Sequence, residues 1–251
     1  MRDRVYRTEG VIIRRSAFGE SDRLLTVYTP QGKRRVVAKG ARKTTSRLAG
    51  HIELFTHAQL LLAVGRNLDI VTQSTVVHDY TRLRGDLKLI GAAYYAAELL
   101  DRLTEEEDAN PKAFRVLVAA LAALDRSQTP DLVLRWYELH LLDTLGFRPQ
   151  LSECVVCQEL LTEDANRFSP TGGGVVCQRC AQTDTTALPM SLGAFKLLRY
   201  LQQQPDDVLD RLNLSTAVRN ETEQLLRALI RRILERDLKS IAFLEEVQQH
   251  P

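Results

Sequence analysis

The sequence predicts an α+β multidomain protein, in which a small N-terminal β-barrel precedes an α-helical domain that carries a four-cysteine insert. Three observations lead to this prediction. Short runs of strand-forming residues fill the first 80 positions, apolar residues recur at helical spacing beyond them, and all four cysteines fall within residues 154–180. With 251 residues, of which 44% are hydrophobic and 26% charged, the chain can bury a sizeable core.

Residues 1–80 have the pattern of a small all-β domain. Runs rich in Val, Ile, Leu, Thr and aromatic residues favour strands over 5–15, 23–28, 33–39, 54–64 and 68–77. Turn-forming glycines, among them Gly19 and Gly40, separate these runs. Five short strands in this length indicate a closed or partly open barrel, a class that includes the oligonucleotide-binding (OB) fold and the SH3-like barrels. We interpret the domain as an OB-fold that binds nucleic acid, with an SH3-like barrel as the alternative.

Residues 81–150 and 189–251 are interpreted as one helical domain. From residue 83 onward, apolar residues recur at intervals of three and four, which is the period of one helix face. Pro111 follows a polar break at 105–110 and suits the first turn of the next helix. Further helices are predicted over 112–125, 131–145, 191–203 and 215–238.

The four cysteines form the strongest motif of the sequence. Two residues separate Cys154 from Cys157 and Cys177 from Cys180, and nineteen residues lie between the two pairs. This spacing is typical of a zinc ribbon or a pair of zinc knuckles, because both thiolates of each pair can turn toward one ion. We interpret residues 151–188 as this module. Two disulfides or four free thiols are the alternatives, and a cytosolic chain disfavours both.

The metal is expected to be one structural Zn²⁺. Four thiolates complete the tetrahedral shell, whereas a catalytic zinc keeps an open position, and the insert contains no histidine that could act as a base. The chain also lacks the phosphate-binding loop, the dinucleotide fingerprint, the H-E-x-x-H pair and the G-x-S-x-G elbow. We therefore assign no catalytic residues and expect a protein that is not an enzyme.

Hydropathy does not predict membrane contact. The longest strongly apolar stretch, residues 116–124, is shorter than the roughly 20 residues that cross a bilayer. The basic first residues are not followed by the apolar core of a signal peptide. We expect a cytoplasmic protein.

Charge is distributed unevenly along the chain. Residues 1–50 hold 13 cations against 4 anions, a balance of +9, whereas residues 81–251 hold 20 against 25, a balance of −5. A basic barrel beside a mildly acidic remainder predicts that the barrel binds a polyanion. The candidate DNA-binding residues lie on the first and third strands and in the loop after the third. They are Arg14, Arg15, Arg34, Arg35, Lys39, Arg42, Lys43 and Arg47.

Four of these candidates form two adjacent pairs on predicted strands, which limits how many can share one face. Neighbouring strand residues point to opposite sides, so one residue each of Arg14–Arg15 and Arg34–Arg35 is expected to contact nucleic acid. Aromatic residues suited to base stacking are few in this domain, which favours contacts to phosphates and little sequence preference. A basic surface that is only solvated, or that binds an acidic protein, is the alternative.

Several segments in a fixed order connect the chain with a known family. They are E-G-V-I-I at 9–13, G-E-S-D-R-L-L-T at 19–26, K-G-A-R-K at 39–43 with Ser46, Y-E-L-H-L-L-D-T-L-G-F at 137–147, and the two cysteine pairs. Each segment is weak alone, but their order is specific and spans essentially the whole chain. In this order the sequence resembles the RecO family of bacterial DNA repair and recombination-mediator proteins.

The resemblance implies an N-terminal OB-fold barrel, a helical domain and a four-cysteine zinc module. It implies binding of single- and double-stranded DNA, annealing of complementary strands, and loading of the RecA recombinase, in the RecF pathway, on gaps coated by single-stranded-DNA-binding protein (SSB). Implied partners are RecR and the acidic C-terminal tail of SSB, and the implied location is the cytoplasm, in association with the nucleoid. The basic DNA-binding positions of the family correspond to the cations around Arg34, Arg35, Lys39, Arg42 and Lys43.

Two other functions remain open from the residues alone. A protein-interaction scaffold would use the basic barrel to hold an acidic partner, and it predicts weak DNA binding. A zinc-containing nucleic-acid enzyme would need paired carboxylates or a phosphate loop, which the sequence does not indicate. The site for the SSB tail is not predicted, although a helical groove with Arg or Lys beside apolar residues would serve.

Overall fold

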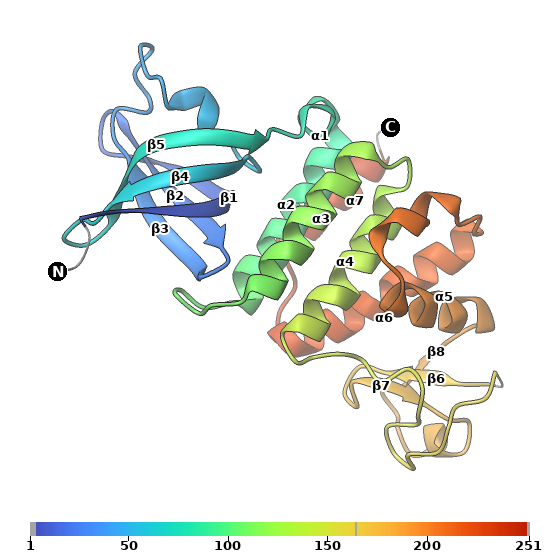
Figure 1. Ribbon diagram of the computed structural model, residues 1–251. Helices are drawn as coiled ribbons and strands as arrows, with labels where there is room; N and C mark the ends of the chain where they lie inside the picture. Colours follow the sequence, from blue (N-terminus) through green and yellow to red (C-terminus); the bar gives the residue numbers. More distant parts are fainter. Residues whose placement is uncertain (1–3, 164, 250–251) are drawn as a thin grey trace.

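The computed structural model describes residues 4–163 and 165–249. A β-barrel comes first, a bundle of helices follows, and a small cysteine-bearing sheet is inserted between helices α4 (Pro130–Thr144) and α5 (Leu192–Gln203) (Figure 1). The barrel and the small sheet lie at opposite ends of the bundle. The β-rich N-terminal domain, the helical domain after it and the clustering of the cysteines are thereby confirmed.

Five strands form the closed barrel. They are β1 (Val5–Phe18), β2 (Asp22–Thr29), β3 (Gly32–Ala38), β4 (His57–Ala63) and β5 (Asp69–His78). The hydrogen-bonded order is β1-β2-β3-β5-β4, and β4 pairs with β1 to close the ring. All pairs are antiparallel except the short parallel pair of β3 with β5. The predicted strands agree with these bounds to within three residues.

Side chains alternate between the two faces of the strands. Those on the inner face fill the barrel, and some of those on the outer face pack against the helices. The interior core includes Ile12, Leu25, Val36, Leu60 and Val71, all buried. Val11 and Ile13, on the opposite face of β1, belong instead to the large core of the helical domain. At Gly10 a Cβ atom would lie 2.4 Å from Val27 Cγ1, so glycine lets β1 pack closely against β2.

The described residues after the barrel form seven α-helices. In addition to α4 and α5 they are α1 (Thr81–Gly85), α2 (Leu87–Leu103), α3 (Pro111–Arg126), α6 (Thr216–Leu234) and α7 (Ser240–Gln249). The Asn110 side chain caps α3 by accepting from the Ala113 N–H, and Pro111 stands in the first turn as predicted. Among these helices none combines the length and apolar character that a membrane crossing requires.

Two helix boundaries depart from the prediction. The helical pattern from residue 83 is broken at Asp86, whose extended backbone lets its carboxylate cap α2 through the Lys88 and Leu89 N–H groups. The helix predicted over 215–238 ends at Leu234, because Glu235 takes a left-handed conformation with φ of 56°, and α7 follows separately. Apolar spacing continues through both breaks and therefore did not indicate them.

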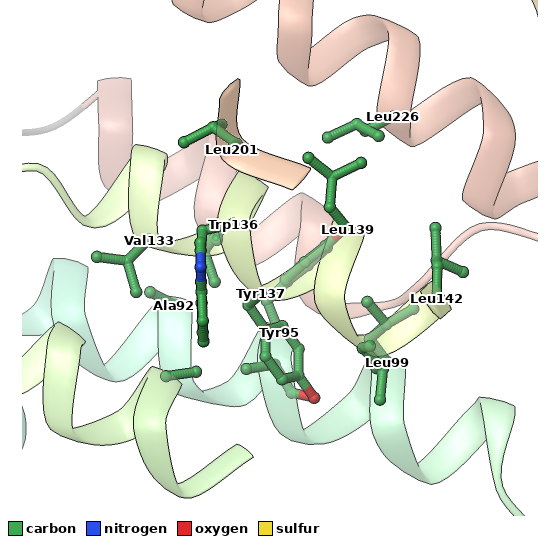
Figure 2. Close-up of a cluster of buried hydrophobic side chains, with 14 of the residues drawn as sticks. Ala92, Tyr95, Leu99, Val133, Trp136, Tyr137, Leu139, Leu142, Leu201 and Leu226 are labelled. Atoms are coloured by element: carbon green, nitrogen blue, oxygen red, sulfur yellow. The ribbon is translucent and has the colours of Figure 1, made fainter. Parts of the chain in front are cut away.

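Helix α4 lies at the centre of the bundle. It packs against α2 and α3 on one side and against α5 and α6 on the other. In Figure 2, Tyr137 of α4 lies beside Tyr95 of α2, and Leu139 of α4 faces Leu226 of α6. The Tyr137 hydroxyl donates to the Ala96 carbonyl at 2.9 Å, which satisfies a polar group inside the core. A helix that is apolar on nearly every side is buried in this way.

One lysine ties the barrel to the bundle. The Lys33 ammonium of β3, only 11% exposed, donates to the Asp101 carbonyl at 2.8 Å, the Asp101 carboxylate at 2.9 Å and the Thr104 carbonyl at 2.9 Å. These carbonyls stand at the end of α2, so a cation from the barrel caps a helix of the next domain. The neighbouring Gly32 has φ of 96°, and a Cβ there would lie 2.4 Å from the Asp108 carbonyl.

The cysteine-bearing insert is a three-stranded sheet. Its strands are β6 (Arg167–Ser169), β7 (Gly174–Val176) and β8 (Leu188–Pro189), in the order β7-β6-β8. Phe168 and Val175 are buried and join the core of the bundle. The insert is thus attached to the helices through one face of its sheet.

Candidate metal centre and nucleic-acid interface

The fold brings all four cysteines together. Cys154 and Cys157 lie in the segment before β6, and Cys177 and Cys180 follow β7. Their sulfur atoms lie within 4.8 Å of one another, and Cys157 Sγ is 3.9 Å from Cys177 Sγ. Four thiolates bound at 2.3 Å to one tetrahedral zinc stand about 3.8 Å apart. The four cysteines are free thiols, and their spacing fits an S₄ metal site rather than a pair of disulfides.

The backbone around Cys154 favours its thiolate. Burial of this sulfur opposes the charged form, but the N–H groups of Cys157, Cys177 and Val156 outweigh burial and lower the pKa of Cys154 to about 6. The Cys177 N–H donates to Cys154 Sγ at 3.4 Å. Backbone N–H groups directed at a sulfur stabilise negative charge there, which is the form that binds a metal.

Three of the eight candidate DNA-binding cations are held by carboxylates. The pairs are Arg14 with Asp101 at 3.2 Å, Arg15 with Glu53, and Arg34 with Glu107 at 3.5 Å. Arg34 also lies 5.8 Å from the ring centre of Tyr6. A phosphate that binds these residues must compete with the carboxylates already there.

The other five candidates have no carboxylate at ion-pair distance among the described residues, and all five are exposed. They are Arg35, Lys39, Arg42, Lys43 and Arg47. Four of them, from Lys39 to Arg47, follow β3, and we call these four the loop cluster. The β1–β2 hairpin holds the start of this loop, because the Arg42 N–H donates to the Ser21 carbonyl at 2.8 Å and the Gly40 N–H to the Asp22 carboxylate at 2.7 Å.

Alternation separates the two residues of each adjacent pair. Arg34 lies over Tyr6, whereas Arg35 lines a depression outside the barrel. The register of β1 against β2 shifts before Arg14 but is regular after it, so Arg14 stands opposite Thr26 and Arg15 opposite the buried Leu25. The two guanidinium groups pair with different carboxylates, and the Arg14 side chain is 70% exposed whereas that of Arg15 is 20% exposed.

Sequence reasoning missed the acidic side of this surface. The acidic run at 105–108 follows α2 and lies against β3, where the Glu107 N–H donates to the Lys33 carbonyl at 3.0 Å. Glu106 and Asp101 line the depression that holds Arg35. No local pattern could have indicated this contact, because it joins segments from two domains.

A cavity of about 330 Å³ opens between α2, α4, α6 and α7. It combines charged and apolar walls. The cations are Lys88, Arg135, Arg219 and Arg227, the carboxylates are Asp131, Glu223 and Glu245, and the apolar residues include Leu134, Ile241 and Leu244. Each of the three arginines pairs with one of these carboxylates. Arg135 is only 5% exposed, and it pairs with Glu138 at 2.7 Å and Glu223 at 3.4 Å.

Glu138 is fully buried beside this cavity. Its Oε1 atom accepts from the Tyr95 hydroxyl at 2.5 Å as well as from Arg135. Burial raises the pKa of Glu138 to about 7, although Arg135 and Tyr95 favour the ionised form. The second oxygen, Oε2, has no hydrogen-bond partner in the described structure, which adds to the cost of keeping the charge there.

Comparison with known proteins relates both parts of the chain to one family. The model for "Recombination protein O N terminal" matches residues 1–80, and that for "Recombination protein O C terminal" matches residues 84–242. A protein of Roseiflexus sp. (strain RS-1) is 63% identical over 99% of this chain and 88% of its own length. Proteins of Dehalococcoides mccartyi (strain ATCC BAA-2266 / KCTC 15142 / 195) and Symbiobacterium thermophilum are 36% and 34% identical, each over 97% of this chain and over 96% and 98% of their own lengths. All three are named DNA repair protein RecO.

Proposed function

The chain belongs to the RecO family of DNA repair proteins, and from this premise we propose that it is a non-enzymatic recombination mediator. It binds single- and double-stranded DNA, anneals complementary strands and helps load the recombinase on gaps coated by SSB, at the nucleoid in the cytoplasm. One observation carries the DNA-binding step. Five exposed cations, the loop cluster and Arg35, have no carboxylate at ion-pair distance within residues 4–163 and 165–249, and all five belong to one barrel.

The strand order supports the OB interpretation of this barrel. Five strands close in the order β1-β2-β3-β5-β4, with β3 parallel to β5. OB-folds are five-stranded barrels that bind oligonucleotides on the face of strands 2 and 3 and with the loops between strands 1 and 2 and between strands 4 and 5. The loop cluster lies between β3 and β4, and its start is hydrogen-bonded to the β1–β2 hairpin, one of these binding loops.

Annealing in this proposal needs no covalent chemistry. Two single strands repel each other through their phosphates, and a surface of Arg and Lys side chains lowers that repulsion. Strands held on one surface meet at a higher local concentration, so complementary bases pair faster. Because the cations contact phosphates, the binding has little sequence preference.

One structural Zn²⁺ is proposed at Cys154, Cys157, Cys177 and Cys180. The spacing of the four sulfurs supports this assignment. A bound zinc would cross-link the segment before β6 to the segment after β7 and leave no open coordination position. Its contribution would be to the stability of the insert and not to a reaction.

The cavity between α2, α4, α6 and α7 is our proposed site for the acidic tail of SSB. Its apolar walls match a hydrophobic residue of such a peptide, and the acidic side chains of the peptide would compete with Asp131, Glu223 and Glu245 for the three arginines. RecR is proposed as a second partner from family membership alone.

The test is fluorescence anisotropy with labelled single-stranded DNA across a salt series. The variant Lys39→Ala/Arg42→Ala/Lys43→Ala should bind more weakly than wild type and lower the slope of log K against log salt by about 2, because each phosphate contact contributes about 0.7. The matched control, Arg231→Ala/Arg232→Ala/Arg236→Ala, removes the same charge from exposed positions at the end of α6. Both variants are compared with wild type in strand annealing as well.

The rival functions give different results in the same assay. If wild type binds DNA weakly and the loop-cluster variant binds as well as wild type, the barrel serves as a scaffold for an acidic protein. Loss of phosphodiester bonds or incorporation of nucleotides with magnesium would indicate an enzyme. Equal weakening by the two triple variants would show that net charge, and not this loop, determines the binding.

A further inference from the structure

We propose that the groove between β1 and helices α2 and α7 binds an unstacked base of single-stranded DNA, with Tyr94 as the stacking surface and the surrounding cations on the adjacent phosphates. This inference rests on the proposed DNA-binding function and assigns it a second element, outside the barrel loop. The groove has a volume of about 580 Å³, within the range of ordinary ligand sites.

The floor of the groove is aromatic. Tyr94 of α2 is 41% exposed, which is unusual for a ring in the middle of a packed helix. Two other rings hold it edge-on, Phe55 at 5.1 Å and Phe243 of α7 at 6.5 Å between ring centres. A ring fixed on two sides loses little freedom when a base stacks on its open face, and base–aromatic stacking tolerates any base.

The rim of the groove is cationic. Arg14 and Arg15 of β1, Arg102 of α2 and Lys239 before α7 line it, and Glu98 is the acidic residue of the lining. A phosphate bound here competes with Asp101 for Arg14, with Glu53 for Arg15 and with Glu98 for Arg102. The Glu98 carboxylate already accepts from the backbone N–H groups of Lys239 at 3.1 Å and Ser240 at 2.8 Å. Because these bonds satisfy that carboxylate, its charge caps the start of α7 and repels a phosphate less than a free carboxylate would.

The groove continues into the basic surface of the barrel. Arg14 and Arg15 line both the groove and the neighbouring depression that holds Arg35. A bound strand can therefore follow Arg35, Arg14 and Arg15 into the groove, and its phosphates compete on the way with Asp101 and Glu106, which also line the depression. This continuity favours a nucleic-acid strand over an acidic peptide, for which the cavity beside Arg135 is the more enclosed site.

The experiment separates stacking from charge. Anisotropy compares wild type, Tyr94→Ala and Tyr94→Phe on three labelled probes of equal length, namely a thymidine oligonucleotide, its abasic counterpart and a blunt duplex. Tyr94→Ala should weaken binding to the thymidine strand about 5- to 30-fold. Binding to the abasic strand and to the duplex should stay within about twofold of wild type, because neither offers an unstacked base. Tyr94→Phe keeps the ring and should bind like wild type.

A matched control tests whether any exposed aromatic residue has the same effect. Tyr200 of α5 is 38% exposed and lies away from the barrel, so Tyr200→Ala should change none of the three affinities. Thermal melting of each variant confirms that it is folded. Equal losses on thymidine and abasic strands, or no loss with Tyr94→Ala, would overturn the inference.

Two further outcomes keep this inference distinct from the proposed function. If wild type fails to bind any probe, the proposed function itself is wrong. If Tyr94→Ala binds all three DNA probes normally but no longer binds a labelled acidic peptide, the groove is a peptide site and the inference fails while DNA binding at the loop cluster stands.

Discussion

At the scale of single residues, the role of each cation depends on its acidic neighbours. Lys33 and Lys43 both belong to the basic N-terminal region and look equivalent in the sequence. In the structure Lys33 is buried against the end of α2, whereas Lys43 is exposed in the loop cluster. The carboxylate that binds Lys33 is Asp101, from another domain, so no nearby residue could have indicated the difference.

The negative charge of Glu138 is unfavourable to the folded state. It is fully buried, its pKa is raised from 4.5 to about 7, and burial is the main cause. The folded protein therefore holds this proton more tightly than the unfolded chain between these two values. The stability associated with the protonated form is complete below pH 4.5 and is lost as the pH rises to about 7.

Glu138→Gln should remove this pH dependence, because glutamine resembles the neutral carboxyl group and cannot ionise. The free energy of unfolding of the variant minus that of wild type should increase by about 1–3 kcal/mol between pH 5 and pH 8, because only wild type loses stability as Glu138 ionises. Urea denaturation of both proteins at the two pH values measures the difference. Groups that titrate in both proteins cancel in this comparison.

A relative stability that stays constant with pH would show that Arg135 keeps Glu138 ionised throughout this range. A change of the opposite sign would show that the ion pair stabilises the fold more than burial opposes it.

At the scale of elements, strands were easier to predict than helix breaks. Strand runs end at glycine turns, and Gly19, Gly32 and Gly40 all take positive φ. The break at Asp86 and the left-handed Glu235 lie within continuous apolar spacing, and tertiary contacts decide them. The four cysteines were predictable because their spacing is local, whereas the groove around Tyr94 combines β1, α2 and α7 and has no local signature.

The acidic run after α2 should weaken DNA binding at β3. Glu107 pairs with Arg34, and Glu106 shares a depression with Arg35, so both carboxylates occupy positions that a phosphate would need. Glu106→Gln/Glu107→Gln should therefore bind single-stranded DNA about 2- to 5-fold more tightly at low salt, since an exposed pair contributes at most about 1 kcal/mol. Anisotropy at low and high salt measures the change, which should shrink as salt increases.

The control for this variant is Glu235→Gln/Asp237→Asn, which removes two exposed carboxylates near the end of α6. An equal gain in both variants would reflect net charge alone. No gain in either would mean that the DNA does not approach the Arg34–Arg35 segment.

At the scale of the whole molecule, the bundle separates the four cysteines of the proposed zinc site from the barrel. The cysteine-bearing sheet and the barrel lie at opposite ends, with the helices between them (Figure 1). Phe168 and Val175 nevertheless join the core of the bundle, so the insert contributes to the stability of the helical domain. Stability and DNA binding should therefore respond differently to loss of the metal.

Removal of zinc by a chelator should lower the melting temperature by several degrees, because metal binding to a small module stabilises its folded state. The affinity for DNA, measured by anisotropy well below the melting transition, should stay within about twofold of that of the zinc-loaded protein. Calorimetry with and without chelator, followed by addition of zinc to restore the transition, makes the measurement. A parallel loss of DNA affinity and stability would place the insert in the DNA interface.

The packing of α7 against α2 determines when the groove can form during synthesis on the ribosome. Gly91 of α2 lies beside Phe243 and Leu244, and a Cβ atom there would be 3.0 Å from Leu244 Cδ2. Proteins fold as they emerge from the ribosome, the N-terminal parts first. The barrel and α2 therefore leave the ribosome well before the helix that covers Gly91 and supports the Tyr94 ring. A nascent chain can carry the basic loop early, but it acquires the groove only once α7 has also emerged.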